Sequence, residues 1–154
     1  MLADTPYLTG LLLTGRRVVV VGGGRVAARR VPTLLAADAE VTVVSPMLHP
    51  DLESLAAAGS IEWERREFRR GDLAGAWYVI AATPSAAVNA AVVDEAEAGH
   101  TFCVRADDGA HGSAWTPATG VHNGLTVGVL GRGDPRRSRR ARDRLLEVAS
   151  VEDL

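Results

Sequence analysis

The sequence predicts an α/β fold: a Rossmann-like, doubly wound parallel sheet with an appended β-hairpin and helix for dimerisation. Three observations support this prediction. An apolar run over residues 18–21 ends in three glycines and is followed at once by a helical pattern. Strand-like and helix-like segments then alternate as far as residue 104, which is typical of a parallel sheet covered on both faces. Beyond them, an Asn-Gly turn joins two more strand-like segments, and a basic helix follows.

The glycine turn follows the pattern Gly22-x-Gly24-x-x-Ala27, which is typical of dinucleotide-binding units. A side chain at Gly22 would obstruct the turn, and the missing Cβ at Gly24 lets the backbone approach a pyrophosphate. The first N–H groups of the helix then point at the phosphates, helped by the helix dipole. The predicted cofactor-binding residues of this turn are Gly22, Gly23, Gly24, Arg25 and Val26. Similar turns also occur without a ligand, so the pattern alone leaves that alternative open.

The other elements of the sheet follow from their apolar periodicity and from their caps. We expect helices over residues 26–37, 49–58 and 85–98, the last capped by Ser85, and strands over residues 40–45, 61–64, 77–82 and 101–104. The charged segment 65–72 is expected to be a solvated connection. The turns that leave four of the strands, at residues 22–24, 45–47, 82–85 and 105–108, then fall on one edge of the sheet. Ligands of parallel sheets bind at this carboxyl edge.

The end of the second strand carries no carboxylate for a ribose 2′-hydroxyl, because Ser45 and Pro46 stand there. The choice between NAD and NADP therefore stays open, with Arg25 either reaching a 2′-phosphate or lying in solvent. We expect the adenosine side of the cofactor to lie against Ser45, Pro46 and Met47. Thr83, after the fourth strand, is expected beside the nicotinamide half.

Asp107 follows the last strand of the sheet at the same edge, with Asp108 beside it. It either serves as an acid–base residue or caps a turn before Gly109, and the residues alone leave both open. His111 lies near it in the sequence and is either a second acid–base group or a solvated loop residue.

Composition excludes several classes of function. The formal net charge of −2 argues against bulk electrostatic binding of nucleic acid. All seventeen basic residues are arginine, which excludes a lysine Schiff base and a P-loop lysine. Cys103 is the only cysteine and the histidines lack metal-ligand spacing, so we predict no disulfide framework and no metal site. No segment is typical of a leader or a membrane span, and we expect a cytoplasmic protein.

The last part of the sequence predicts strands over residues 114–121 and 125–130, joined by His122-Asn123-Gly124. Asp134 is the expected N-cap of the final helix, with Pro135 at its first position. The helix carries six arginines, which form either a solvated face or a basic rim for an anionic ligand: Arg136, Arg137, Arg139, Arg140, Arg142 and Arg144. By analogy, a hairpin and helix appended to a doubly wound sheet make a dimer contact.

Together these residues resemble the N-terminal domain of siroheme synthase, the precorrin-2 dehydrogenase family. The resemblance covers nearly the whole chain in order and lies in these stretches: Leu13-Thr14-Gly15-Arg16, Val20-Val21-Gly22-Gly23-Gly24-x-Val26-Ala27-x-Arg29, Ala81-Ala82-Thr83 with Val88-Asn89, Asp107-Asp108 with Pro117, and Val127-Gly128-Val129 ahead of Gly133-Asp134-Pro135.

The resemblance implies NAD-dependent dehydrogenation of precorrin-2 to sirohydrochlorin, with Fe(II) insertion in some members. It places the family's important acid on Asp107, and it suggests substrate binding by Arg132, Arg136, Arg137 and His111. It further implies an NAD-binding domain over residues 1–113 and a dimerising hairpin and arginine-rich helix over residues 114–154. The expected partners are precorrin-2, a second copy of the chain and a separate uroporphyrinogen methyltransferase. Two alternatives stay open: a non-catalytic nucleotide-sensing module, and a ferrochelatase that keeps the NAD pocket only as scaffold.

Overall fold

A computed structural model describes residues 5–151 of the chain. The chain divides into two compact units, Met1–Ala114 and Trp115–Leu154.

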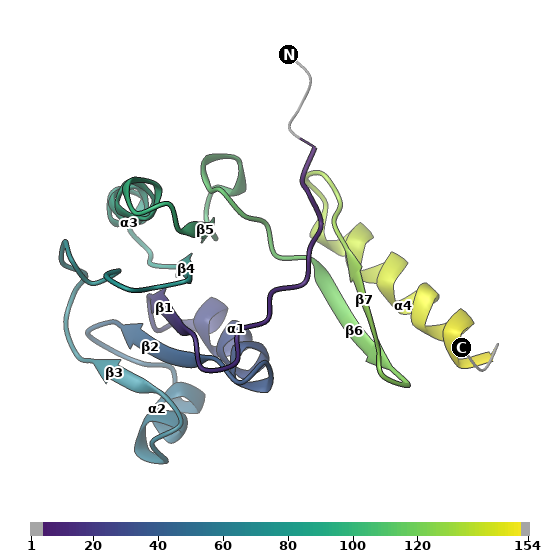
Figure 1. Ribbon diagram of the computed structural model, residues 1–154, viewed down its shortest axis with the longest axis horizontal. Helices are drawn as coiled ribbons and strands as arrows, with labels where there is room; N and C mark the ends of the chain where they lie inside the picture. The colour runs from purple at the N-terminus through teal and green to yellow at the C-terminus, as the bar shows by residue number, and fades with distance from the viewer. Residues whose placement is uncertain (1–4, 152–154) are drawn as a thin grey trace. The chain divides into compact units, whose positions relative to one another are not determined.

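The first unit is built on a parallel sheet of five strands in the order β3-β2-β1-β4-β5 (Figure 1). The strands are β1 (Arg17–Val21), β2 (Glu40–Val44), β3 (Glu62–Glu64), β4 (Tyr78–Ala81) and β5 (Phe102–Arg105). The helices are α1 (Arg25–Ala36), α2 (Pro50–Ala57) and α3 (Ala86–Ala98), with a short 3-10 turn, η1, at Gly109–His111. The predicted Rossmann-like α/β class is confirmed.

Alternate residues of the strands enter two separate hydrophobic clusters, one on each face of the sheet. Val18 and Val20 of β1 pack with Ala27, Val31 and Leu34 of α1, and Leu52 of α2 belongs to the same cluster. Val19 and Val21 belong to the other cluster, which includes the buried face of α3: Val92, Val93 and Ala96. The central strands are therefore buried on both faces, as expected for a parallel sheet.

The connection from β3 to β4 is mostly exposed over residues 65–72, as the sequence predicted, and an ion pair orders it. Arg66 donates two hydrogen bonds to Asp72, from Nη1 to Oδ2 and from Nη2 to Oδ1, each at 2.8 Å. Oε1 of Glu95, on α3, accepts from the backbone N–H groups of Gly71 (2.9 Å) and Leu73 (3.2 Å). These contacts bring the Leu73 side chain into the α3-side cluster.

Residues 112–114 run along the outer edge of β5. The Cys103 N–H donates to Ser113 Oγ, and the Ser113 N–H donates to the Cys103 carbonyl, both at 2.9 Å. Ala114 forms an isolated parallel bridge with Val104. The prediction that a strand begins at residue 114 is therefore wrong, because Ala114 belongs to this edge segment.

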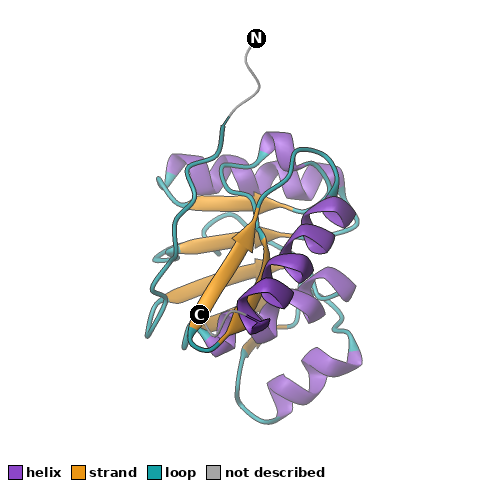
Figure 2. Ribbon diagram, turned by 90° about the vertical axis from the view of Figure 1, so that its right-hand side faces the viewer, coloured by secondary structure: helices purple, strands orange, loops and turns teal. Residues whose placement is uncertain are grey.

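The second unit consists of an antiparallel hairpin, β6 (Ala118–His122) and β7 (Leu125–Val129), and of helix α4 (Pro135–Val151). β6 begins only after Pro117, which has no N–H group to donate to a ladder. Asn123 and Gly124 have φ values of 44° and 77°, so the predicted Asn-Gly turn is confirmed. Helix α4 lies along the hairpin (Figure 2), and Arg142 Nη1 donates to the Thr119 carbonyl at 2.8 Å.

No helix within residues 5–151 has both the length and the apolar character needed to cross a membrane.

Candidate cofactor and catalytic site

The turn after β1 packs against the turns that follow β2 and β4. Gly22 has a φ of +115°, and a Cβ added there would overlap the carbonyl group of Ala82. A Cβ on Gly23 would overlap the Met47 carbonyl oxygen and lie 2.9 Å from Ser45 Oγ. A Cβ on Gly24 would meet no protein atom within 4 Å. Two glycines therefore let the loops come together, and the third faces open space.

Helix α1 begins at this turn without a side-chain cap. Its N-cap residue is Gly24, and its first turn contains no acidic residue. By contrast, side-chain acceptors cap α2 (His49), α3 (Ser85) and α4 (Asp134). Uncapped N–H groups at a positive helix end suit an anionic group such as a pyrophosphate. The exposed Arg25 and the half-buried Val26 belong to this first turn.

Ser45 directly follows β2, and its hydroxyl group is directed at its own turn. The side chain is buried, and Oγ donates to the Met47 carbonyl at 2.7 Å. Trp63 Nε1 donates to the Ser45 carbonyl at 2.9 Å, which ties this turn to β3. Pro46 and Met47 are exposed after it, so an apolar surface follows the strand where other dinucleotide sites place an acid.

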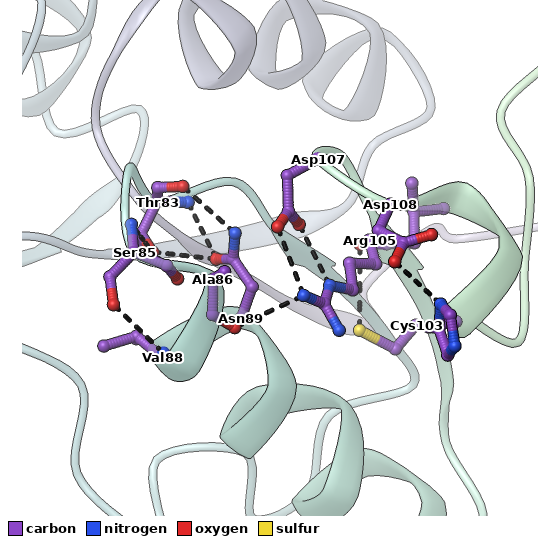
Figure 3. A network of polar contacts seen from close by, with 11 residues as sticks. Thr83, Ser85, Ala86, Val88, Asn89, Cys103, Arg105, Asp107 and Asp108 are labelled. Atoms are coloured by element: carbon purple, nitrogen blue, oxygen red, sulfur yellow. Dashed lines mark hydrogen bonds and ion pairs between the residues drawn. The ribbon is translucent and has the colours of Figure 1, made fainter.

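Thr83 lies in the turn between β4 and α3, and the Asn89 side chain fixes its position (Figure 3). Asn89 Oδ1 accepts from the Thr83 N–H at 3.0 Å and from Thr83 Oγ1 at 2.8 Å, and Asn89 Nδ2 donates to the Thr83 carbonyl at 3.0 Å. Asn89 is completely buried. This role of Asn89 was not predicted from the sequence, although a polar residue in register with the buried Val92, Val93 and Ala96 was a usable signal.

Asp107 lies after β5 and forms a bidentate ion pair with Arg105 (Figure 3). Arg105 Nε donates to Oδ1 at 3.0 Å, and Nη2 donates to Oδ2 at 3.2 Å. These hydrogen bonds are the main reason why the pKa of Asp107 is lowered from its ordinary value. The carboxylate is therefore ionised at neutral pH, as a proton acceptor must be, although the same pairing lowers its proton affinity.

His111 is not paired with Asp107. Its Nδ1 lies 2.7 Å from Asp108 Oδ2, and the imidazole is largely exposed at the end of η1. Cys103 is buried in the sheet, and burial raises the pKa of its thiol to about 11. It is therefore a neutral packing residue.

The arginines predicted to bind substrate, Arg132, Arg136 and Arg137, are exposed and lie in the second unit. The start of α4 is already occupied by Asp134, whose Oδ1 accepts from the N–H groups of Arg136 (2.9 Å) and Arg137 (3.0 Å). Both bonds lower the pKa of Asp134, and the bond from Arg137 is the larger cause. The backbone at this helix end is thus capped by the chain itself, so any anion would be held by the guanidinium groups.

Comparison with known protein families places the first unit among cofactor-binding domains. Residues 11–118, more than half of the chain, match the family model described as "Putative NAD(P)-binding".

Known relatives share much of this chain. It is 40% identical over 134 residues to siroheme synthase 3 of Aeromonas hydrophila, a match that covers 86% of this chain and 29% of that one. It is 34% identical over 122 residues to precorrin-2 dehydrogenase of Bacillus subtilis, covering 79% of this chain and 74% of the relative. The chain thus spans less than a third of the siroheme synthases it matches.

A solved structure has the same fold. SirC, a precorrin-2 dehydrogenase, superposes with a TM-score of 0.81 and 26% sequence identity, covering 93% of this chain and 71% of that one.

Proposed function

Since the chain belongs to the NAD(P)-binding family that contains precorrin-2 dehydrogenase and the N-terminal part of siroheme synthase, we propose that it catalyses the NAD-dependent dehydrogenation of precorrin-2 to sirohydrochlorin in siroheme biosynthesis. The observation that carries the proposal is the glycine turn, where an uncapped helix start and open space at Gly24 suit a pyrophosphate.

In this proposal each loop at the carboxyl edge has a separate task. Gly22, Gly23, Gly24, Arg25 and Val26 hold the pyrophosphate side of NAD. The adenosine side lies against Ser45, Pro46 and Met47, and Thr83 borders the nicotinamide half. When bound, NAD supplies the hydride acceptor for the reaction.

Asp107 is the proposed acid–base residue. Its ionised carboxylate accepts the proton that leaves the macrocycle as the second hydrogen is removed. The acidic side chains of the tetrapyrrole would contact Arg132, Arg136 and Arg137, because guanidinium groups bind carboxylates with two parallel hydrogen bonds. His111 is a further proposed substrate-binding residue.

The assembly is also a proposal. We expect the second unit to join two copies of the chain, and a separate uroporphyrinogen methyltransferase to supply the substrate in the cytoplasm. Exposed apolar side chains on α4, namely Leu145, Val148 and Val151, support a contact with another chain.

The test is anaerobic incubation of the protein with precorrin-2, with and without NAD, while the absorbance of sirohydrochlorin is followed. We expect product only when NAD is present, and none from the Asp107→Asn variant. Binding of NAD without product from the wild type would contradict catalysis and favour a nucleotide-sensing module. Insertion of Fe(II) into sirohydrochlorin with no oxidation of precorrin-2 would favour the ferrochelatase alternative.

A further inference from the structure

Arg105 is the last residue of β5, and its side chain turns back along the carboxyl edge toward Asp107. Two different guanidinium nitrogens donate to the two oxygens of one carboxylate, at 3.0 and 3.2 Å. This side-by-side arrangement fixes both the position and the plane of a carboxylate, which a single hydrogen bond does not.

The guanidinium group is itself held in place. Nη2 of Arg105 also donates to the carbonyl oxygen of Ala86, the first residue of α3, at 3.3 Å. The Arg105 side chain is only 12% exposed, whereas that of Asp107 is 33% exposed. The arginine is therefore anchored between β5 and α3, and the aspartate is the partner that still faces solvent.

The charges around the pair are mostly acidic. Asp94 on α3 and Asp108 in the next position both act on Arg105, and Asp108 is itself paired with His111. On the α3 side, the neutral amide of Asn89 is a lesser cause of the lowered pKa of Asp107. Arg105 is thus a cation on which three carboxylates act, and the hydrogen-bonded one among them is Asp107.

We propose that Arg105 is a positioning residue, whose guanidinium group fixes the position and the plane of the Asp107 carboxylate at the cofactor edge. The proposal rests on the dehydrogenase function proposed above. It requires no contact between Arg105 and the substrate, because Arg105 acts through Asp107.

The experiment compares Arg105→Gln and Arg105→Lys with the wild type. Glutamine removes the charge. Lysine keeps the charge, but its ammonium group cannot donate two parallel hydrogen bonds to one carboxylate as a guanidinium group does. The rate of precorrin-2 oxidation is measured against pH, and the Asp107 carboxyl group is titrated by ¹³C NMR, with Asp107→Asn used to assign its signal. The NMR titration is independent of activity.

We expect Arg105→Gln to raise the pKa of Asp107 and to move the acidic limb of the kcat/KM profile to higher pH. Since a misplaced catalytic group costs on the order of a hundredfold, kcat should fall by about ten- to a hundredfold with little change in KM. In Arg105→Lys, the pKa of Asp107 should stay close to its wild-type value, whereas kcat should lie between those of the wild type and Arg105→Gln.

The matched control is Arg66→Gln, which breaks another bidentate Arg–Asp pair of the same unit, the one with Asp72. It should leave the pKa of Asp107 and the pH profile unchanged, which separates a local effect from a general loss of stability.

Two results would overturn the proposal. One is an unchanged Asp107 titration in both Arg105 variants. The other is a higher KM for precorrin-2 at unchanged kcat, which would make Arg105 a substrate-binding residue. If the wild type does not oxidise precorrin-2 but the Asp107 pKa still rises in Arg105→Gln, the proposed function fails while the positioning of Asp107 stands.

Discussion

At the scale of single residues, the three consecutive glycines after β1 have different tasks. Gly22 and Gly23 are required by the protein itself, since a Cβ on either would overlap backbone atoms of a neighbouring loop. Gly24 has a φ of −89° and open space around it, so only a bound molecule would meet a side chain there.

This difference predicts the behaviour of Gly24→Ala. Its free energy of unfolding should stay within about 0.5 kcal/mol of the wild type, because the new methyl group contacts nothing. Its affinity for NAD should fall about tenfold or more, which corresponds to at least ~1.4 kcal/mol of binding energy. Urea unfolding and isothermal calorimetry measure the two quantities. Gly10→Ala, another glycine with open space around it, is the control and should change neither.

Asn89 is the residue on which the Thr83 turn depends. Asn89→Ala would leave the partly buried N–H and carbonyl groups of Thr83 without their partner, so we expect a loss of about 2 kcal/mol in the free energy of unfolding. NAD binding should weaken as the turn loosens. Ser85→Ala, which removes the cap of the same helix, should cost about 1 kcal/mol and serves as the control. A wild-type affinity for NAD in Asn89→Ala would show that the turn is not part of the cofactor site.

At the scale of elements, the ion pair in the connection between β3 and β4 makes stability depend on pH. Arg66, the largest cause, lowers the pKa of Asp72 below its ordinary value of 3.8. The folded pKa is thus below the unfolded one. The resulting stabilisation is present above the unfolded value and is lost as the pH falls through the folded pKa.

Asp72→Asn should therefore be less stable than the wild type at neutral pH, by about 1 kcal/mol because the pair is partly screened by solvent. Its stability should also fall less steeply in acid. Urea unfolding between neutral pH and pH 3 measures both effects. Glu67→Gln, an exposed change in the same connection, should retain the wild-type slope. If the free energy of unfolding changed with pH in the same way for Asp72→Asn and the wild type, this account would be wrong.

Most elements were predictable from local pattern. Apolar runs and glycine turns predicted the five parallel strands, and the caps Ser85 and Asp134 are confirmed by their hydrogen bonds. The resemblance to the precorrin-2 dehydrogenase family is also confirmed. The contacts within the candidate site were less predictable. The Arg105–Asp107 pair depends on how the loop after β5 turns back, and periodicity carries no information about that. The roles of the predicted site residues stay predictions.

At the scale of the whole molecule, the second unit gives a prediction about assembly. A two-stranded hairpin with one helix buries few side chains, and small units of this kind are marginally stable without further packing. We therefore expect the chain to be a dimer by sedimentation equilibrium. Val148→Glu, in the exposed apolar stripe of α4, should shift it toward monomer, whereas Ser150→Glu, on a different face of the helix, should not. A wild-type monomer at micromolar concentration would contradict the prediction.

The segment 112–114 along β5 protects the sheet against aggregation. An unpaired strand edge is a template for aggregation, and proteins protect such edges by covering, shortening or charging them. At one edge of the sheet, Ser113 forms hydrogen bonds with both the N–H and the carbonyl group of Cys103. At the other edge, β3 has only three residues and exposes Glu62 and Glu64. Gly112 has no room for a side chain, since a Cβ would lie 2.8 Å from the Cys103 carbonyl oxygen. A larger residue at position 112 would thus displace this segment from β5. The exposed strand edge could then pair with a strand of another molecule, and the protein would aggregate.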